Sequence, residues 1–325
     1  MENVFDWGME LIIALQATGS PFLDSFFEVV TFTGEEMFYL LFTPILFWGI
    51  DHSVAARVGF AFLISAYVNP ILKDLFLQPR PYEVNPEVSE YVVAGSGMPS
   101  GHAQSSVFVW GTFAWQVGRG WFWGLAVVWM FLVGFSRVYL GVHFPHQVLA
   151  GWLVGAVLLL LFILFDPRFE SWMLRLPMSR QLLVAVGVPV LMAAAYPHND
   201  TVSSAAVMCG FGSGFVLMRR YCPYSASGFW WQRVLRSILG LAGLLVLYIG
   251  LGLLAPEKGT INEALYYGTR FLRYGVMGLW ISFGAVLLYP SGPAPARSCP
   301  AAGIKARGFF GLRILSTMTR VYSGV

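Results

Sequence analysis

The sequence is poor in charge. Only 11% of its 325 residues are Asp, Glu, Lys or Arg, whereas 57% are hydrophobic, and soluble domains carry about 25% charged residues. So much apolar surface has no polar complement to face water, but a bilayer requires none. The composition therefore excludes a water-soluble globular protein and a disordered chain, and it predicts an integral membrane protein.

Cysteine is also scarce. Cys209, Cys222 and Cys299 lie far apart, cannot all pair and match no metal-ligand spacing. A disulfide scaffold is therefore excluded, and we expect the three thiols to be small buried side chains.

Long apolar runs, by contrast, are numerous. Runs near the length that spans a bilayer as a helix, about 17 to 25 residues, occur at residues 36–50, 55–76, 102–118, 121–138, 147–165, 181–197, 201–218, 234–254 and 265–289. They predict an all-α integral membrane protein with about nine transmembrane helices. The count is open by one, because only Gly118, Arg119 and Gly120 separate the third run from the fourth.

The runs divide the chain into four predicted parts. In residues 1–34 acids interrupt the apolar residues, which favours two amphipathic helices at an interface, broken at Gly19, Ser20 and Pro21. Residues 35–165 form a membrane core and residues 166–290 additional transmembrane helices. Residues 291–325 form a basic cytoplasmic tail that either lies along anionic lipid or is disordered.

The charges assign the two faces of the membrane. If the nine runs cross alternately, 14 of the 20 basic residues fall on one side with only three of the 17 acids. By the positive-inside rule this side is cytoplasmic, and it holds the C-terminus. Loops 77–101 and 139–146 then face the periplasm, the lumen or the exterior. Because most basic residues lie in short loops, the basic pI of 8.8 does not indicate a nucleic-acid partner.

Three polar segments on the outward side suggest a phosphate site. Lys73, Arg80 and Arg137 place three cations on one face, and a guanidinium fork matches two phosphate oxygens at once. Ser100 and Gly101 stand where the next helix begins, so that free backbone N–H groups there can bind an anion and the glycine lets it approach closely.

Two histidines in the same segments add a means of cleavage. One neutral imidazole can attack phosphorus while the other protonates the departing alkoxide, and His102 and His143 are suited to these tasks near physiological pH. The cations offset the charge of the transition state, so we expect neither metal nor other cofactor. Each residue alone has a plainer interpretation, as a snorkelling or interfacial side chain. Because all of these residues lie on the same face of the membrane, a shared phosphate site is favoured over these separate interpretations.

The motifs K-x6-R-P, P-S-G-H and S-R-x5-H, which together span residues 73–147, resemble the signature of the type 2 phosphatidic acid phosphatase superfamily. The resemblance implies a six-helix phosphatase-type core within about residues 20–165, followed by the C-terminal helices, and a phosphohistidine intermediate. The roles it implies are His143 as nucleophile, His102 as general acid, and Lys73, Arg80, Ser100, Gly101 and Arg137 as the phosphate-binding residues, Arg137 acting in catalysis as well.

One position departs from the superfamily pattern. Four residues after the nucleophile the family usually carries Asp, and here the residue is Gln147. Its carbonyl can orient the imidazole of His143 but adds no negative charge, so either the rate is lower or another group compensates. The stretch H-F-P-H-Q is similar to the glucose-6-phosphatase branch, where Gln is ordinary, and this argues against loss of activity.

The leading hypothesis is a metal-independent membrane phosphatase that hydrolyses a phosphomonoester or a pyrophosphate. A phosphorylated lipid is the favoured substrate, and a polyprenyl pyrophosphate or a sugar phosphate is an alternative. A non-catalytic phosphate-lipid binding protein or transporter, with Gln147 marking relaxed catalysis, is the second hypothesis, and phosphotransfer to an acceptor other than water is a third. The C-terminal helices complete the fold, form a dimer interface or make a second module, and the oligomeric state is open.

Overall fold

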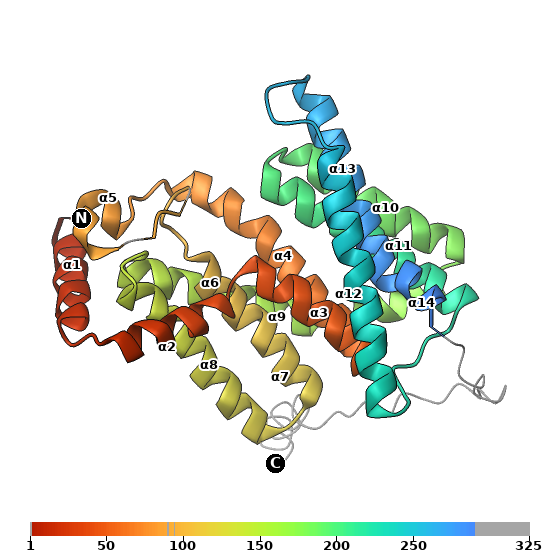
Figure 1. Cartoon of the computed structure of the whole chain (residues 1–325), viewed down its shortest axis with the longest axis horizontal. Coiled ribbons are helices and arrows are strands. Elements are labelled where there is room, and N and C mark those ends of the chain that lie inside the picture. The colour runs from red at the N-terminus through yellow and green to blue at the C-terminus, as the bar shows by residue number, and fades with distance from the viewer. Residues whose placement is uncertain (1, 90, 94, 290–325) are drawn as a thin grey trace, which may run out of the picture. The chain divides into compact units, whose positions relative to one another are not determined.

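The computed structural model describes residues 2–89, 91–93 and 95–289, and these residues form helices joined by short connections (Figure 1). The helices are α1 (Glu2–Ala17), α2 (Pro21–Phe32), α3 (Glu36–Gly49), α4 (His52–Phe76), α5 (Pro81–Val84), η1 (Pro86–Val88), α6 (Gly101–Ser105), η2 (Ser106–Trp110), α7 (Gly111–Val117), α8 (Gly120–Tyr139), α9 (Pro145–Arg175), α10 (Met178–Ala195), α11 (Asn199–Tyr221), α12 (Trp230–Leu253), α13 (Glu263–Leu279), η3 (Trp280–Gly284) and α14 (Ala285–Leu287). The predicted basic tail, residues 291–325, lies outside the described residues.

Each of the nine apolar runs lies almost wholly within a helical segment. The third run is the continuous series α6, η2 and α7, and the last is α13, η3 and α14. Within the described ranges, six helices have the length and apolarity to cross a bilayer, or seven if α2 and α3, which bend by 58°, form one span. The all-α multi-pass class is thus confirmed, and the count of nine stays a prediction.

The predicted N-terminal pair is present as α1 and α2. The hydroxyl of Ser20 caps α2 by accepting a hydrogen bond from the N–H of Leu23 at 3.3 Å, and Pro21 opens the helix, where a missing N–H costs nothing. The break between the two helices therefore follows from local chemistry.

Helices α6 and α9 approach each other closely because α9 carries glycines on the facing side. A Cβ atom on Gly151 would lie 2.5 Å from the carbonyl oxygen of Ser100, and one on Gly155 would lie 2.5 Å from that of Gln104. Small residues at this spacing let two membrane helices meet backbone to backbone. The contact brings the start of α6 to the start of α9.

A buried polar network fixes α6 to α4. The amide of Asn69 donates to Oε1 of Gln104 at 3.1 Å and to the carbonyl of Pro99 at 3.2 Å. The amide of Gln104 donates in turn to Oγ of Ser65 at 2.9 Å, and this oxygen lies 3.0 Å from Oγ of Ser105. Because these groups are buried, their mutual hydrogen bonds specify how the two helices dock.

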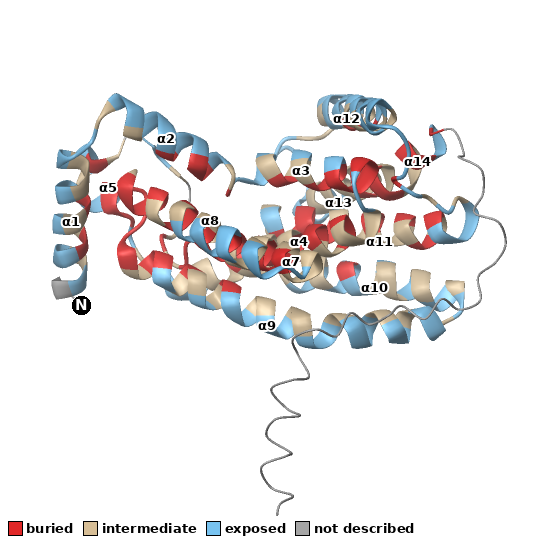
Figure 2. Cartoon of the chain, turned by 90° about the horizontal axis from the view of Figure 1, so that it is seen from below, coloured by how far each residue is buried: buried red, intermediate tan, exposed pale blue. Residues whose placement is uncertain are grey.

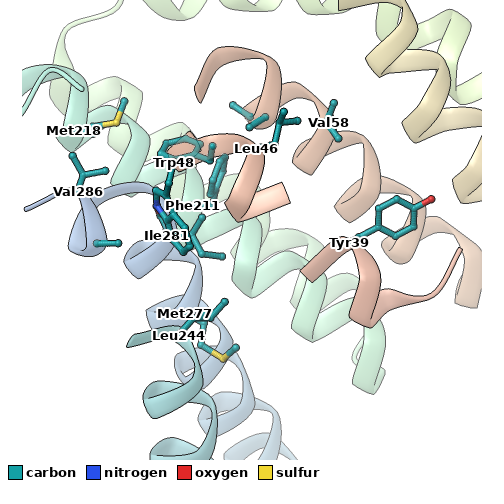
Figure 3. Packing of buried hydrophobic residues seen from close by; sticks show 14 of the residues in the cluster. Tyr39, Leu46, Trp48, Val58, Phe211, Met218, Leu244, Met277, Ile281 and Val286 are labelled. Carbon is teal, nitrogen blue, oxygen red and sulfur yellow. The ribbon is translucent and has the colours of Figure 1, made fainter. Parts of the chain in front are cut away.

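The C-terminal helices pack against the first half, and residues 1–289 form one compact unit. Their shared core includes Trp48 from α3, Phe211 from α11, Leu244 from α12 and Ile281 from η3 (Figure 3). The indole of Trp48 donates to the carbonyl of Ile281 at 2.9 Å. Helices α10 and α12 bury few residues and present largely apolar outer faces, as expected of helices that face lipid (Figure 2).

Helix α9 continues beyond the apolar run that predicts it, from Pro145 to Arg175. Asp166 and Glu170 are one turn apart, and both pair with Arg57 of α4, at 2.8 and 2.6 Å. The one guanidinium thus offsets part of the charge of the two carboxylates, and the helix does not end where the charges begin. The predicted boundary between residues 165 and 166 lies inside this helix.

Candidate active site

The three motif segments meet around His143. This residue lies in loop 140–144 between α8 and α9, is 2% exposed, and places its Nε2 atom 3.2 Å from Nη1 of Arg80. Burial and the nearby charges of Arg137, Arg80 and Lys73 hold the pKa of His143 well below its ordinary value of 6.5. The imidazole is therefore neutral, as a nucleophile must be.

The hydrogen bonds of His143 determine which ring nitrogen carries the proton. Nδ1 lies 2.8 Å from the carbonyl oxygen of Gly97 and 3.3 Å from Oε1 of Gln147. Both partners are acceptors, so Nδ1 donates and Nε2 keeps its lone pair. Arg80 donates to that lone pair. The ring thus presents a nucleophilic Nε2 to the guanidinium that would bind phosphate.

Gln147 is held by three hydrogen bonds and is fully buried. Its Oε1 accepts from Nδ1 of His143 and from the N–H of Phe144 at 3.1 Å, and its Nε2 donates to the carbonyl of Pro79 at 2.8 Å. The last bond needs an amide, because a carboxylate has no proton to give. Gln147 therefore joins the first motif segment to the third and also caps α9.

Arg80 is buried and connects the loops around His143. Its Nε donates to the carbonyl of Gly95 at 2.9 Å, and its Nη1 donates to the carbonyl of Val142 at 3.3 Å in addition to His143. Gln78 closes the same loops, since its carbonyl accepts from the N–H of Gly97 at 2.8 Å. This arrangement holds the Gly97 carbonyl against the imidazole.

Arg137 is 5% exposed and is held from α2. Its Nη1 donates to Oγ1 of Thr31 at 2.6 Å, and its Nε has no hydrogen-bond partner among the residues that the structure describes. A buried N–H donor without a protein partner is costly, and an oxyanion would satisfy it.

The start of α6 is less open to an anion than its sequence suggests. The N–H of Ser100 donates to the carbonyl of Gln147 at 3.1 Å, and its hydroxyl caps α6 by accepting from the N–H of Ala103 at 3.5 Å. A Cβ on Gly101 would lie 2.9 Å from Oδ1 of Asn69, so packing against α4 already requires the glycine. Within the described ranges, the N–H groups of Gly101 and His102 have no such partner and remain suited to an anion.

His102 and Lys73 complete the predicted set. The Nε2 atom of His102 is buried without a hydrogen-bond partner in the described part of the chain. Lys73 is half-buried in the last turn of α4, close enough for its charge to act on His143. The structure thus gathers all the predicted site residues in one region of the molecule.

A cavity of about 770 Å³ opens beside this region. His102, Arg137 and Thr31 border it, and so do four acids: Glu28, Glu35, Glu36 and Asp200. The cavity therefore has a cationic and imidazole border at the motif residues and carboxylates elsewhere on its wall.

Two contributors were missed by the motif analysis. Thr31, which positions Arg137, comes from the predicted interfacial segment, where one threonine gives no signal. Gly97 acts through its backbone carbonyl, which every residue possesses. His146 lies beside the site and its Nε2 is 2.9 Å from Oε1 of Gln78, so that it braces the loop that carries Gln78.

Known proteins resemble this chain over much of its length. The chain matches the PAP2 superfamily over residues 54–171 and the transmembrane extension of PAP2 superfamily phosphatases over residues 202–290. Sphingosine-1-phosphate phosphatase 2 of Mus musculus is 28% identical over 203 residues, which cover 57% of this chain and 54% of the relative. Glucose-6-phosphatase catalytic subunit 1 of Haplochromis nubilus is 26% identical over 233 residues, covering 60% and 64%.

Among solved structures, a PAP2 type phosphatidylglycerolphosphate phosphatase from Bacillus subtilis aligns with a TM-score of 0.46 at 23% identity, covering 52% of this chain and 88% of that one. The chain spans about half the length of the mouse relative. The two family matches lie on either side of residues 172–201 and together cover more than half of the sequence. The chain belongs to the PAP2 superfamily.

Proposed function

We propose that this protein is a membrane phosphatase that hydrolyses the phosphate monoester of a lipid through a phosphohistidine intermediate. The observation that carries the proposal is the state of His143: a buried, neutral imidazole with Nδ1–H held by two oxygens and Nε2 directed at Arg80. An imidazole kept only for packing has no need of a guanidinium at its free lone pair.

In the first step, Nε2 of His143 attacks phosphorus and the bond from phosphorus to the ester oxygen breaks. With the negative charge of the bound phosphate beside it, His102 is protonated, and it gives this proton to the ester oxygen, so that the alcohol leaves neutral. The phosphorylated ring keeps its proton on Nδ1, where the carbonyls of Gly97 and Gln147 accept it and stabilise the positive charge.

In the second step, a water molecule gives a proton to the now neutral His102 and attacks phosphorus. The bond from phosphorus to Nε2 breaks, inorganic phosphate leaves, and His143 is neutral again. Arg80, Arg137 and Lys73 offset the charge that gathers on the phosphate oxygens in both steps. Lys and Arg side chains can offset this negative charge without a metal ion.

A lipid phosphate is the substrate that we favour, and the proposed active-site face is the periplasmic, lumenal or exterior one. The sphingosine-1-phosphate phosphatase similarity supports a lipid substrate, and the charge asymmetry of the loops supports the face. The glucose-6-phosphatase similarity keeps a sugar phosphate as a competing substrate in the assay below.

The test is phosphate release by the detergent-purified full chain, with EDTA present, from matched lipid, polyprenyl and sugar phosphates. We expect turnover of a lipid phosphate and a loss of at least about a thousandfold for His143→Ala. His52→Ala is the matched control, because His52 is a histidine at the first turn of α4, whereas the site residue Lys73 lies in the last turn of the same helix. Wild-type protein quenched with SDS at alkaline pH should carry phosphate on histidine, because the bond from phosphorus to an imidazole nitrogen hydrolyses in acid.

Two results would contradict the proposal. A folded His143→Ala protein with near wild-type turnover would exclude His143 as the nucleophile. Wild-type and variant proteins that both bind lipid phosphate and release none would instead support the binding or transport role.

A further inference from the structure

The cavity beside the site touches the two histidines unequally. His102 borders it, whereas His143 is not among the described residues that line it. His102 is the residue that protonates the leaving oxygen in the proposed mechanism. The group attached to that oxygen must therefore lie on the His102 side of the phosphate, which is the side of the cavity.

Much of the cavity wall is apolar and comes from both halves of the chain. Leu40 of α3 and Leu63 of α4 line it from the phosphatase half, and Val207 and Phe211 of α11 and Ile281 of η3 line it from the C-terminal helices. These last three residues fall within the segment matched as the transmembrane extension. The extension is therefore part of the chamber that opens at the general acid.

The lining also indicates how a substrate would be oriented. Glu28, Glu35, Glu36 and Asp200 on the wall repel an anion, so the phosphate belongs at the end bordered by Arg137 and His102. The remaining apolar lining suits a hydrocarbon chain. The volume of about 770 Å³ is within the range of about 300 to 1,000 Å³ that is usual for ligand pockets.

We propose that this cavity holds the hydrocarbon chain of the leaving alcohol, and that Val207, Phe211 and Ile281 of the transmembrane extension set the chain length that is accepted. The inference rests on the proposed phosphatase activity and assigns a task to helices that the chemistry leaves unused. Lipid tails are as apolar as the cavity wall, so selection between chains arises from steric fit and not from hydrophobic transfer.

Val207→Phe is the decisive variant. Val207 is half-buried on the cavity wall, and the larger ring would occupy space that a long chain needs. Val246→Phe is the matched control, because Val246 is 68% exposed on the lipid-facing side of α12 and does not line the cavity. Val207→Leu adds less volume to the cavity wall and serves as the second test variant if Val207→Phe does not fold.

The experiment measures kcat/KM for butyl, octyl, dodecyl and octadecyl phosphate with each purified protein. We expect Val207→Phe to lower the ratio of octadecyl to butyl phosphate turnover by roughly fivefold to 150-fold, the range that corresponds to overpacking a well-packed site. Val207→Leu should lower it less, and Val246→Phe should leave it unchanged. The short ester should be cleaved by all four proteins at similar rates.

The outcomes separate the inference from the function on which it rests. Wild-type turnover with the same chain-length ratio in Val207→Phe, Val207→Leu and wild type would refute the inference alone. An equal loss for every ester in Val207→Phe, with the Val207→Leu ratio unchanged, would also refute it, because a general defect is not selection by length. A wild-type protein that cleaves none of these esters, nor any phosphate in the panel above, would overturn the phosphatase proposal itself.

Discussion

Replacing Gln147 by Ala tests how the imidazole of His143 is oriented. The variant loses three hydrogen bonds, to His143, Phe144 and Pro79. At about 1 kcal/mol for each bond, the free energy of unfolding should fall by about 3 kcal/mol. The strongest bond to Nδ1 of His143, 2.8 Å to the carbonyl of Gly97, is untouched.

The catalytic effect should therefore be smaller than the structural one. Because the Gly97 carbonyl still keeps the proton on Nδ1, we expect kcat to fall by no more than about tenfold, which is 1.4 kcal/mol of barrier. If Gln147 were the main orienting group, its loss would resemble the removal of a triad carboxylate, which costs about 10⁴ in kcat.

The assay is phosphate release under EDTA at substrate saturation, with thermal unfolding followed on the same preparation. A folded Gln147→Ala protein whose kcat is down a thousandfold or more would refute the reasoning that Gly97 holds the ring. Gln147→Glu is the companion variant: it keeps the shape but faces the Pro79 carbonyl with an oxygen in place of an N–H donor, so it should lose stability as well.

Two further predictions concern pH and packing. His143 lies outside the membrane spans, and folding lowers its pKa, so the folded protein binds fewer protons than the unfolded chain. The free energy of unfolding should therefore keep its full value above pH 6.5 and fall as the pH drops below 6.5. Thermal unfolding measured against pH should show this loss, and a His143→Ala protein with the same slope would contradict it. Gly151→Ala should cost about 1 to 3 kcal/mol of stability and lower turnover, because its Cβ would stand 2.5 Å from the Ser100 carbonyl. Gly124→Ala is the control, since nothing lies within 4 Å of its Cβ; equal unfolding temperatures for the two variants would exclude the α6 to α9 contact as the cause.

The helices were predictable from the sequence because a membrane helix needs only length and apolarity. The run at residues 55–76, for example, lies within α4, which spans His52–Phe76. The end of α9 was not predictable in this way. In the sequence, Asp166 and Glu170 mark the end of an apolar run. In the structure both pair with Arg57, more than 100 positions away, and the helix continues past them.

The candidate site shows the same division. Side chains with distinctive chemistry, such as Arg80 and His143, were found from their types and spacing. The packing that requires a glycine at position 101 could not be found in this way, because the nearest atom to a Cβ there belongs to Asn69 of another helix. Nor does the sequence say that Val207 and His102 line one cavity, since that depends on how the C-terminal helices fold back on the core.

The carbonyl of Gly97 has a consequence for mutational studies of this protein. Substitution changes side chains, and the acceptor that holds Nδ1 of His143 belongs to the main chain, so an alanine scan would pass over it. Gly97→Ala would not isolate it either, because a Cβ there would collide with the Gln147 amide at 2.6 Å. Replacing Met98 by its α-hydroxy acid analogue would convert the peptide bond after Gly97 into an ester with a weaker acceptor oxygen. Backbone chemistry of this kind, and not residue exchange, is what would reveal the group that sets the tautomer.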